Sequence, residues 1–311
     1  MSEQHNLKNA GNGGGAGNAD TELNAVIAEQ KKRINKGTAI IIIGILFLLG
    51  VVFTMNPILI ILAVIVIGIG FRFHSSAAGA IKAGMVKPVL VPALESVFDH
   101  VVYRPEDHIP DHIIKNTDMG FGFTIDKIYG SDYVKAEYQG VGIEMSDVQL
   151  VTIEETEDKD GNTAETEYTR FRGMWLVCDF HKQFSADLLL QEQENIMGTP
   201  SRKGIRTDND AFNKKFCIQS DSSHDVFYIL TPHMMEYILS MDKAADGHTR
   251  MRFLKEGKIV LALDTGRDIF EVNQISNVSA ESLQTQFVNE ISYVTNLIDE
   301  LRLVKTLHEK P

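Results

Sequence analysis

The pattern of apolar and polar residues separates a strongly apolar N-terminal pair of runs from a longer, alternating body. Residues 38–55 form one uninterrupted apolar run, and residues 58–73 form a second whose single charge is Arg72. As a helix the first run would measure roughly 27 Å, and the second slightly less, against about 30 Å for the hydrocarbon core of a bilayer. Pro57 lacks a backbone N–H and disfavours helix at the residue before it, which predicts a turn between the runs. The sequence therefore predicts a transmembrane helical hairpin over residues 37–73.

The charges around the two runs predict their orientation. Basic residues flank both runs, and the connecting turn carries no charge. Under the positive-inside rule, both ends of the pair and both chain termini lie in the cytoplasm, and residues 38–73 contact the lipid bilayer. A buried helical pair in a soluble core is the alternative, although runs so rich in Ile, Leu and Val have no polar face. The flanking basic residues are Lys31, Lys32, Arg33 and Lys36 on one side, and Arg72, Lys82 and Lys87 on the other.

Three further segments surround this pair. Residues 1–36 begin with a glycine-rich stretch, which we expect to be disordered because it cannot bury a core, and end in a juxtamembrane helix that starts at Asp20. Residues 74–119 are interrupted by prolines, which predicts short linker helices. Residues 120–311 are expected to form a cytoplasmic domain.

The cytoplasmic domain is expected to have an α+β fold. Alternating apolar and polar residues predict short strands, and glycine-containing turns predict that neighbouring strands are antiparallel. A long C-terminal helix, capped by Ser279, carries apolar residues at spacings of three and four and would close the domain. The expected strands are 124–129, 133–138, 141–145, 148–155, 166–180, 251–254 and 258–263, with turns at Gln139-Gly140, Asp160-Gly161-Asn162 and Lys255-Glu256-Gly257 and a helix opening at Thr231-Pro232.

Charge and cysteine content exclude several classes of protein. The net charge is −12, and because residues 1–87 carry eight basic and four acidic residues, the rest of the chain carries −16. So acidic a domain is a poor nucleic-acid binder, since phosphate contacts need clustered Lys and Arg. Two cysteines are too few for a disulfide scaffold. Residues 37–71 hold no ionisable group, which weighs against a transport path.

The sequence offers few candidates for chemistry, and we predict no catalytic residue and no cofactor. The strongest cluster is Asp107, His108, Asp111 and His112, in which two histidines four residues apart could share a metal ion. Pro110 lies between them and makes one regular helix through both doubtful, so solvated loop histidines are the favoured interpretation. Residues 198–204 could hold a phosphate on backbone donors, but an exposed turn is favoured there too. Cys178 lies in an apolar strand and is expected to be inert.

A set of turns and strand ends carries a resemblance to a known family. It consists of Gly130-Ser131-Asp132-Tyr133-Val134, Gly140-Val141, Phe171-Arg172-Gly173, Asp179-Phe180-His181-Lys182, Leu230-Thr231-Pro232 and residues 253–259. Preceded by two apolar helices, these motifs resemble a bacterial family known as domain of unknown function 3137, over roughly residues 80–305. Ser131 departs from the pattern, in which an acidic residue is more common. The resemblance implies a bacterial inner-membrane protein with an α+β cytoplasmic domain, and it transfers no chemistry.

Three functions are consistent with these features. A membrane-anchored scaffold or interaction protein with an unknown protein partner is favoured, because an anchor and a domain are recognisable while a catalytic motif is not. A membrane-surface enzyme that uses the His/Asp cluster or His181 is the first alternative. A subunit of an oligomeric transporter or channel is the second, since two helices cannot enclose a pore alone. Whether the chain forms a homo-oligomer stays open.

Overall fold

The computed structural model describes two compact units, each with its own packing. The first comprises Met1–Ala93 with Val272–Val288, and the second comprises Leu94–Glu271 with Asn289–Pro311. The described residues are 16–54, 60–72, 90–157, 163–180, 184, 186–193, 195–196, 199–200, 204–245, 247–268 and 280–306.

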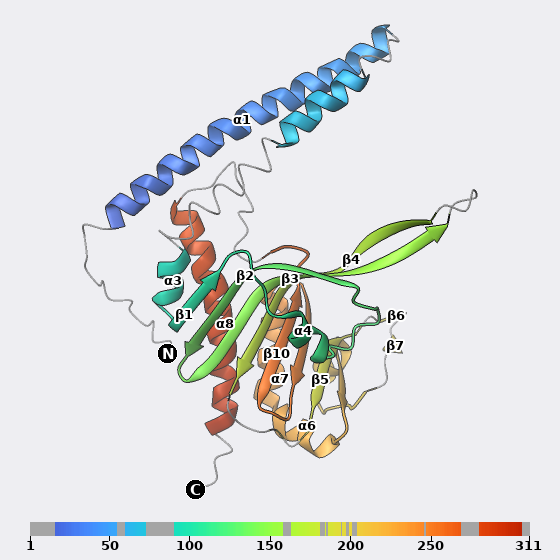
Figure 1. Cartoon of the computed structure of the whole chain (residues 1–311). Coiled ribbons are helices and arrows are strands. Elements are labelled where there is room, and N and C mark those ends of the chain that lie inside the picture. The colour runs from blue at the N-terminus through green and yellow to red at the C-terminus, as the bar shows by residue number, and fades with distance from the viewer. Residues whose placement is uncertain are drawn as a thin grey trace. The chain divides into compact units, whose positions relative to one another are not determined.

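The first unit contains two apolar helices, α1 (Ala16–Thr54) and a shorter helix, Ile60–Arg72 (Figure 1). The stretch Lys31–Gly50 of α1, 20 residues, is long and apolar enough to cross a membrane, whereas Ile60–Arg72 is shorter. The sequence predicts a juxtamembrane helix and a separate membrane helix, but α1 runs through both without a break. Gly37 at the junction costs an α-helix only about 1 kcal/mol, less than the hydrogen bonds that a break would lose. Residues 16–19, expected to be disordered, are helical as well.

Glycines bring these two helices into close contact. A Cβ added at Gly44 would lie 2.5 Å from Cγ1 of Ile67, and one added at Gly70 would lie 2.5 Å from Cγ1 of Ile41. Gly70 also approaches the carbonyl of Gly37, at 2.9 Å from the added Cβ. Because rising numbers on one helix meet falling numbers on the other, the two helices are antiparallel. The turn predicted at Asn56-Pro57 lies outside the described residues.

The second unit is built on an eight-stranded antiparallel sheet in the order β1-β2-β3-β4-β10-β9-β5-β8. This confirms the predicted α+β class, with an antiparallel sheet and a long C-terminal helix, α8 (Ala280–Thr306). The strands are β1 (Asp99–Arg104), β2 (Lys127–Tyr138), β3 (Val141–Glu157), β4 (Thr163–Asp179), β5 (Leu188–Glu192), β8 (Phe216–Ser220), β9 (His248–Phe253) and β10 (Lys258–Asp264). The short strands β6 (Asn195–Ile196) and β7 (Thr199–Pro200) pair separately.

Several strands differ from the sequence prediction. The expected strands 124–129 and 133–138 are largely one strand, β2, because a β-bulge between Ser131 and Val134 absorbs the break in alternation. Likewise, β3 joins two expected strands. The stretch predicted as linker helices, 74–119, contains the helices α3 (Val91–Glu95) and α4 (Asp111–Asn116), but it also contributes the edge strand β1.

The predicted turns and helix cap that lie in the described residues have the backbone angles and hydrogen bonds expected from their sequence. Gln139 and Gly140 have φ of 49° and 79°, the two positive values of a tight hairpin turn, and Gly257 has φ of 90°. Thr231 accepts a hydrogen bond from the N–H of Met234 (3.2 Å) and caps α7 (Pro232–Ala245). The Asp160-Gly161-Asn162 turn and Ser279 lie outside the described residues.

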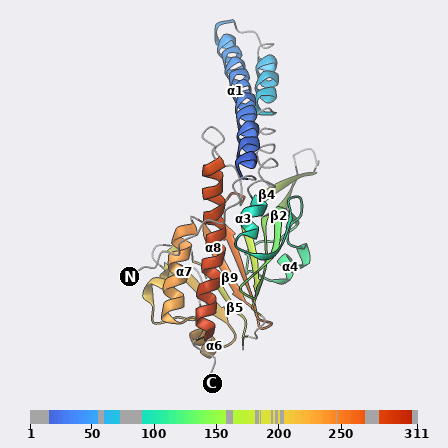
Figure 2. The same ribbon diagram turned by 90° about the vertical axis from the view of Figure 1, so that its left-hand side faces the viewer.

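Both faces of the sheet are covered near its centre. Helices α7 and α8 lie on one face, and α4 with the chain that follows it lies on the other (Figures 1 and 2). Trp175, fully buried on β4, packs with Phe171 at a ring-centroid distance of 6.0 Å, beneath α4 residue Ile114. As predicted, β4 is therefore a central, covered strand. The α8 stripe that is buried against the other face includes Ile291, Val294 and Ile298.

Beyond the sheet, β3 and β4 continue as a two-stranded ribbon (Figure 1). Residues 163–170 of β4 are all exposed, and pairs such as Thr152 with Tyr168 and Glu155 with Glu165 have no third strand beside them. Such a ribbon has no core of its own, and opposed glutamates do not stabilise it.

Candidate functional site

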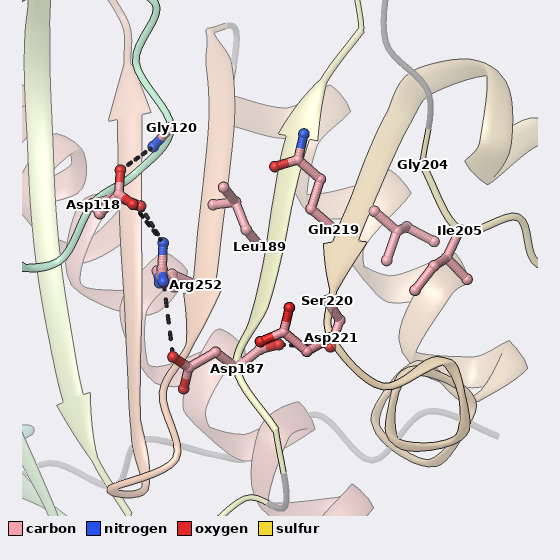
Figure 3. Close-up of a pocket in the computed structure, with 11 residues that line it drawn as sticks. Asp118, Gly120, Asp187, Leu189, Gly204, Ile205, Gln219, Ser220, Asp221 and Arg252 are labelled. Atoms are coloured by element: carbon pink, nitrogen blue, oxygen red, sulfur yellow. Dashed lines mark hydrogen bonds and ion pairs between the residues drawn. The ribbon is translucent and has the colours of Figure 1, made fainter.

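A cleft of about 630 Å³ lies on the second unit (Figure 3). It lies over the ends of β5, β8 and β9 and is bordered by residues 118–120 on one side and 204–205 on the other. This volume is in the usual range for small-ligand sites. Its walls carry Asp118, Asp187, Asp221, Arg252, Ser220 and Gln219 as polar residues, and Leu189, Ile205 and Ile218 as apolar ones.

Arg252 on β9 lies between two of the carboxylates (Figure 3). Its Nη1 donates a hydrogen bond to the carbonyl oxygen of Asp118 and lies 3.6 Å from Oδ2 of that residue. Its Nη2 lies 3.8 Å from Oδ2 of Asp187. Both ion pairs are longer than hydrogen bonds, so the carboxylate oxygens keep capacity to accept hydrogen bonds from a ligand.

The backbone holds Asp118 and Asp187 in place. Asp118 has φ of 47° and Gly120 has φ of 63°, and a Cβ added at Gly120 would lie only 1.8 Å from Nε2 of Gln191. Glycine is required at that position because the chain passes directly over Gln191. Across the cleft, Oδ1 of Asp187 accepts from the N–H of Lys255 (2.8 Å), and its carbonyl accepts from Oγ of Ser220 (2.6 Å).

Gln191 itself is fully buried beneath this segment. Its Nε2 donates to the carbonyl oxygen of Met119 (3.2 Å), while its Oε1 has no hydrogen-bond partner among the described residues. An unsatisfied buried acceptor of this kind costs free energy and is a common sign of a ligand or water site.

A second charged cluster lies on the opposite face of β5. Nζ of Lys215, at the end of α5 (Asp210–Lys215), lies 2.9 Å from Oε2 of Glu192 and 3.0 Å from Oδ2 of Asp242. Glu192 also accepts from the N–H of Thr249 (2.6 Å) and lies 3.1 Å from Nδ1 of His248. Neighbouring β5 residues Gln191 and Glu192 point to opposite faces, so this cluster is separate from the cleft.

The two carboxyl groups of this cluster have opposite pKa shifts. Burial alone would raise the pKa of Glu192, but hydrogen bonds from Asp242, Lys215, Thr249 and His248 outweigh burial and lower it to about 2. Burial, together with the neighbouring Glu192 carboxylate, raises the pKa of Asp242 above its ordinary value. Lys215 therefore bridges two carboxyl groups whose pKa values are shifted in opposite directions. This bridge supports the contact of α5 and α7 with the sheet.

The predicted His/Asp cluster is only partly assembled. Nε2 of His108 lies 2.9 Å from Oδ1 of Asp111, while Asp107 pairs with Arg104 at 3.4 Å and His112 is exposed. Pro110 directly precedes α4, so the two histidines do not share one helix. Across the part of the chain that the structure describes, no three His, Cys, Asp or Glu side chains are grouped as metal ligands.

The Gly130–Val134 motif has a structural explanation. Asp132 is buried in the β2 bulge with φ of 58°, and its N–H donates to the carbonyl of Pro105 (3.0 Å). Its carboxylate accepts hydrogen bonds from the hydroxyls of Tyr103 and Ser131, the latter at 3.0 Å. Burial and the Asp132 carboxylate raise the pKa of Tyr103. These hydrogen bonds connect the β2 bulge to the end of β1 and stabilise the loop that leads from β1 to α4.

The remaining sequence candidates lie elsewhere. Burial raises the pKa of Cys178 to about 12, which agrees with an inert thiol. Most of the 198–204 loop and His181 lie outside the described residues, although Gly204 lines the cleft. The cleft residues were not predicted from the sequence. Their only local signal is the alternation of Arg250 and Arg252 with apolar residues in β9.

Comparison with known proteins matches one part of the chain to a family. No curated protein and no solved structure matches the chain. A family model matches residues 169–303, a range that includes Asp187, Asp221 and Arg252 but neither Asp118 nor the two apolar helices. Residues 169–303 thus carry the sequence pattern of the family described as Protein of unknown function (DUF3137).

Proposed function

We propose that the chain is a membrane-anchored module that recognises a protein partner at the cytoplasmic face of the bacterial inner membrane. The observation that carries the anchor is the exposure of large apolar side chains along both helices of the first unit. Leu46, Ile61 and Val64 are 59%, 62% and 64% exposed. Soluble proteins rarely expose contiguous apolar surface of this extent.

The packing of the two helices supports a hairpin in lipid. Small residues face the partner helix, with Ala63 fully buried and Gly44 and Gly70 in close contact, while the large apolar residues face outward. Membrane helices associate in this way, because lipid supplies no hydrophobic force between them and close backbone approach must replace it. The 20 residues of Lys31–Gly50 extend about 30 Å as a helix, which matches a bilayer core.

The same contacts support the proposed orientation. Because Gly70 lies beside Gly37, Arg72 and Lys36 are at the same end of the pair. Basic residues gathered at one end favour the cytoplasmic side for that end.

The second unit supports an interaction role. Residues 88–311, which contain the second unit, carry a charge of −16. This part of the chain is therefore repelled by an anionic lipid surface, which leaves the cleft and the ribbon free for a partner. The family that matches residues 169–303 has no assigned reaction that would favour an enzyme over an interaction protein.

The anchor is tested by sedimentation of full-length protein from bacterial membranes. We expect the chain to stay in the pellet through high salt and alkaline carbonate and to be released by detergent. Replacing outward-facing Ile65, near the middle of the second apolar run, by Arg should impair insertion, since a central Arg costs about 2.5–3.5 kcal/mol. Ile65→Leu is the matched control. Full-length protein that remains in the supernatant without detergent would refute the anchor.

The interaction role is tested separately, by affinity capture from detergent-solubilised membranes. A partner retained by the wild type and lost from a chain whose ribbon carries Glu155→Lys and Glu165→Lys would support it. Recovery of no protein above background would count against it, whatever the sedimentation result.

A further inference from the structure

We propose that the outer edge of β4 in the ribbon binds an extended basic segment of a protein partner. The segment adds to the sheet as a strand and places lysine or arginine side chains over Glu165 and Glu155. The proposal rests on the proposed interaction role and names the chemistry of the partner. It is carried by the direction of the backbone groups along this edge and by the charge of one face of the ribbon.

Contacts of β3 show which backbone groups of the ribbon point outward. The N–H of Ile153 donates to Oδ2 of Asp126 (2.7 Å), and the carbonyl oxygen of Val151 accepts from the N–H of Asp126 (2.9 Å). Both residues therefore point away from β4, and their contacts occupy the base of the outer edge of β3. In an antiparallel pair, the residue opposite such a residue also points away from the shared ladder. On β4 these opposite residues are Glu167 and Thr169, which direct their N–H and C=O groups to the outer edge.

This outer edge of β4 is open. Glu165 continues the alternation, and within the described residues nothing pairs with the outward backbone groups of Glu165, Glu167 and Thr169. Strand β10 and the turn after it cover the edge only as far as Arg172, whose carbonyl accepts from the N–H of Gly266 (2.9 Å). An added strand would therefore continue the row that β10 begins. Unpaired edges of this kind bind extended peptides by strand addition.

The charge of one face of the ribbon favours a basic segment. Glu155 and Glu165 lie directly opposite each other in a pair without mutual backbone hydrogen bonds, which brings their side chains close together. Neither forms an ion pair among the described residues, whereas Glu154, on the other face, pairs with Arg170 at 2.6 Å. Opposed like charges destabilise a ribbon, and a lysine or arginine on an added strand would relieve this repulsion.

A partner protein fits this edge better than the chain itself does. A second copy would bring the same glutamates, and like charges on edge strands oppose self-pairing. Residues 269–279, which follow β10 in the chain, contain one acidic residue, Glu271, and no Lys or Arg. The basic stretch Lys31–Lys36 is part of helix α1, so its backbone groups are not available to a strand.

Fluorescence anisotropy of a labelled eight-residue peptide, in which lysine alternates with threonine, tests the proposal on full-length protein in uncharged detergent. We expect saturable binding that weakens with salt, and slower amide hydrogen exchange over residues 163–170 in the bound state. The same peptide with all backbone nitrogens methylated keeps its charges but has no backbone donor, and it should bind about 10-fold more weakly. A peptide with glutamate in place of lysine should not bind.

Variants of the ribbon separate charge from backbone pairing. Glu165→Gln should lower the affinity for the lysine peptide about 2- to 5-fold, as loss of a partly exposed ion pair does. Glu154→Gln removes the same charge from the opposite face and is the matched control, with an expected change below about 1.5-fold. Thr169→Pro removes one outward N–H without a change of charge and should weaken binding about 5-fold. Thermal unfolding shows whether this variant is folded; if it is not, the methylated peptide alone measures the backbone contribution.

Four outcomes would each overturn the proposal: no saturable binding, equal binding of the methylated peptide, equal effects of Glu165→Gln and Glu154→Gln, or unchanged hydrogen exchange over residues 163–170. The interaction role is judged separately. A membrane partner that the wild type captures and the chain with Glu155→Lys and Glu165→Lys loses, together with no binding of the lysine peptide, would keep that role and reject this class of partner.

Discussion

In the second unit, several single residues supply hydrogen-bond or ion-pair partners for polar groups that the fold buries. Asp132 does so for the loop after β1, and Lys215 does so for two acids on different elements. A lysine between two carboxylates is worth little as an exposed pair, but removing it leaves like charges together in a partly buried site. Residues of this kind carry stability without any role in chemistry.

Lys215→Met is therefore expected to destabilise the second unit by about 1–3 kcal/mol at neutral pH. The pKa of Glu192 is lowered in the fold to about 2 from an ordinary 4.5, so its stabilisation is present above pH 4.5 and is lost as the pH falls toward 2. The variant lacks the part of this contribution that Lys215 supplies, so the difference from wild type should shrink over that interval. Denaturant unfolding at several pH values measures it.

Lys243→Met, which removes an exposed lysine from α7, is the control and should change the unfolding free energy by less than about 0.5 kcal/mol. A Lys215→Met penalty that stays constant from pH 7 to pH 2 would show that the loss is one of packing and not of charge.

At the scale of elements, glycine decides how closely the two apolar helices approach. Gly44 and Gly70 face the neighbouring helix, whereas a Cβ at Gly68 would meet no atom within 4 Å. The three residues have the same helix propensity, so contact alone distinguishes them.

Gly44→Leu should separate the helices and destabilise the pair by about 1–3 kcal/mol, as overpacking does. Gly68→Leu, which points into open space, should be neutral or slightly stabilising. Thermal unfolding in detergent, followed by helical circular dichroism, compares the two. Equal effects would mean that the helices do not pack through Gly44.

Elements that depend on residues close together in the chain form where the sequence predicts them. The Gln139-Gly140 turn, the Thr231 cap and the covered strand around Trp175 each depend on a few neighbouring residues, and each forms as predicted. Strands β5 and β8 were not predicted, because short apolar runs such as Leu188–Leu190 do not distinguish strand from helix by period. Their pairing with each other and of β5 with β9 defines them.

For the whole molecule, the two units differ in what their surfaces expose. The first exposes large apolar side chains along both of its helices, whereas the second buries a layer of apolar residues on each face of its sheet and exposes only scattered ones such as Phe227. Removal of residues 1–73 should therefore release the chain into the soluble fraction, with a cooperative unfolding transition. Gel filtration and calorimetry check this. A truncated chain that still sediments with membranes would place a membrane contact in the second unit.

The sequence by itself determined the apolar runs, the sign and distribution of charge, the turns and the α+β class, since these depend on composition and on residues close together in the chain. Only the tertiary structure decided the cleft and the Glu192–Lys215–Asp242 cluster. Asp118, Asp187, Asp221 and Arg252 meet because the sheet places β9 beside β5 and β5 beside β8, and the segment at residue 118 crosses them. Such neighbours are fixed by long-range pairing and by burial against covering segments, and neither leaves a periodic trace in the sequence.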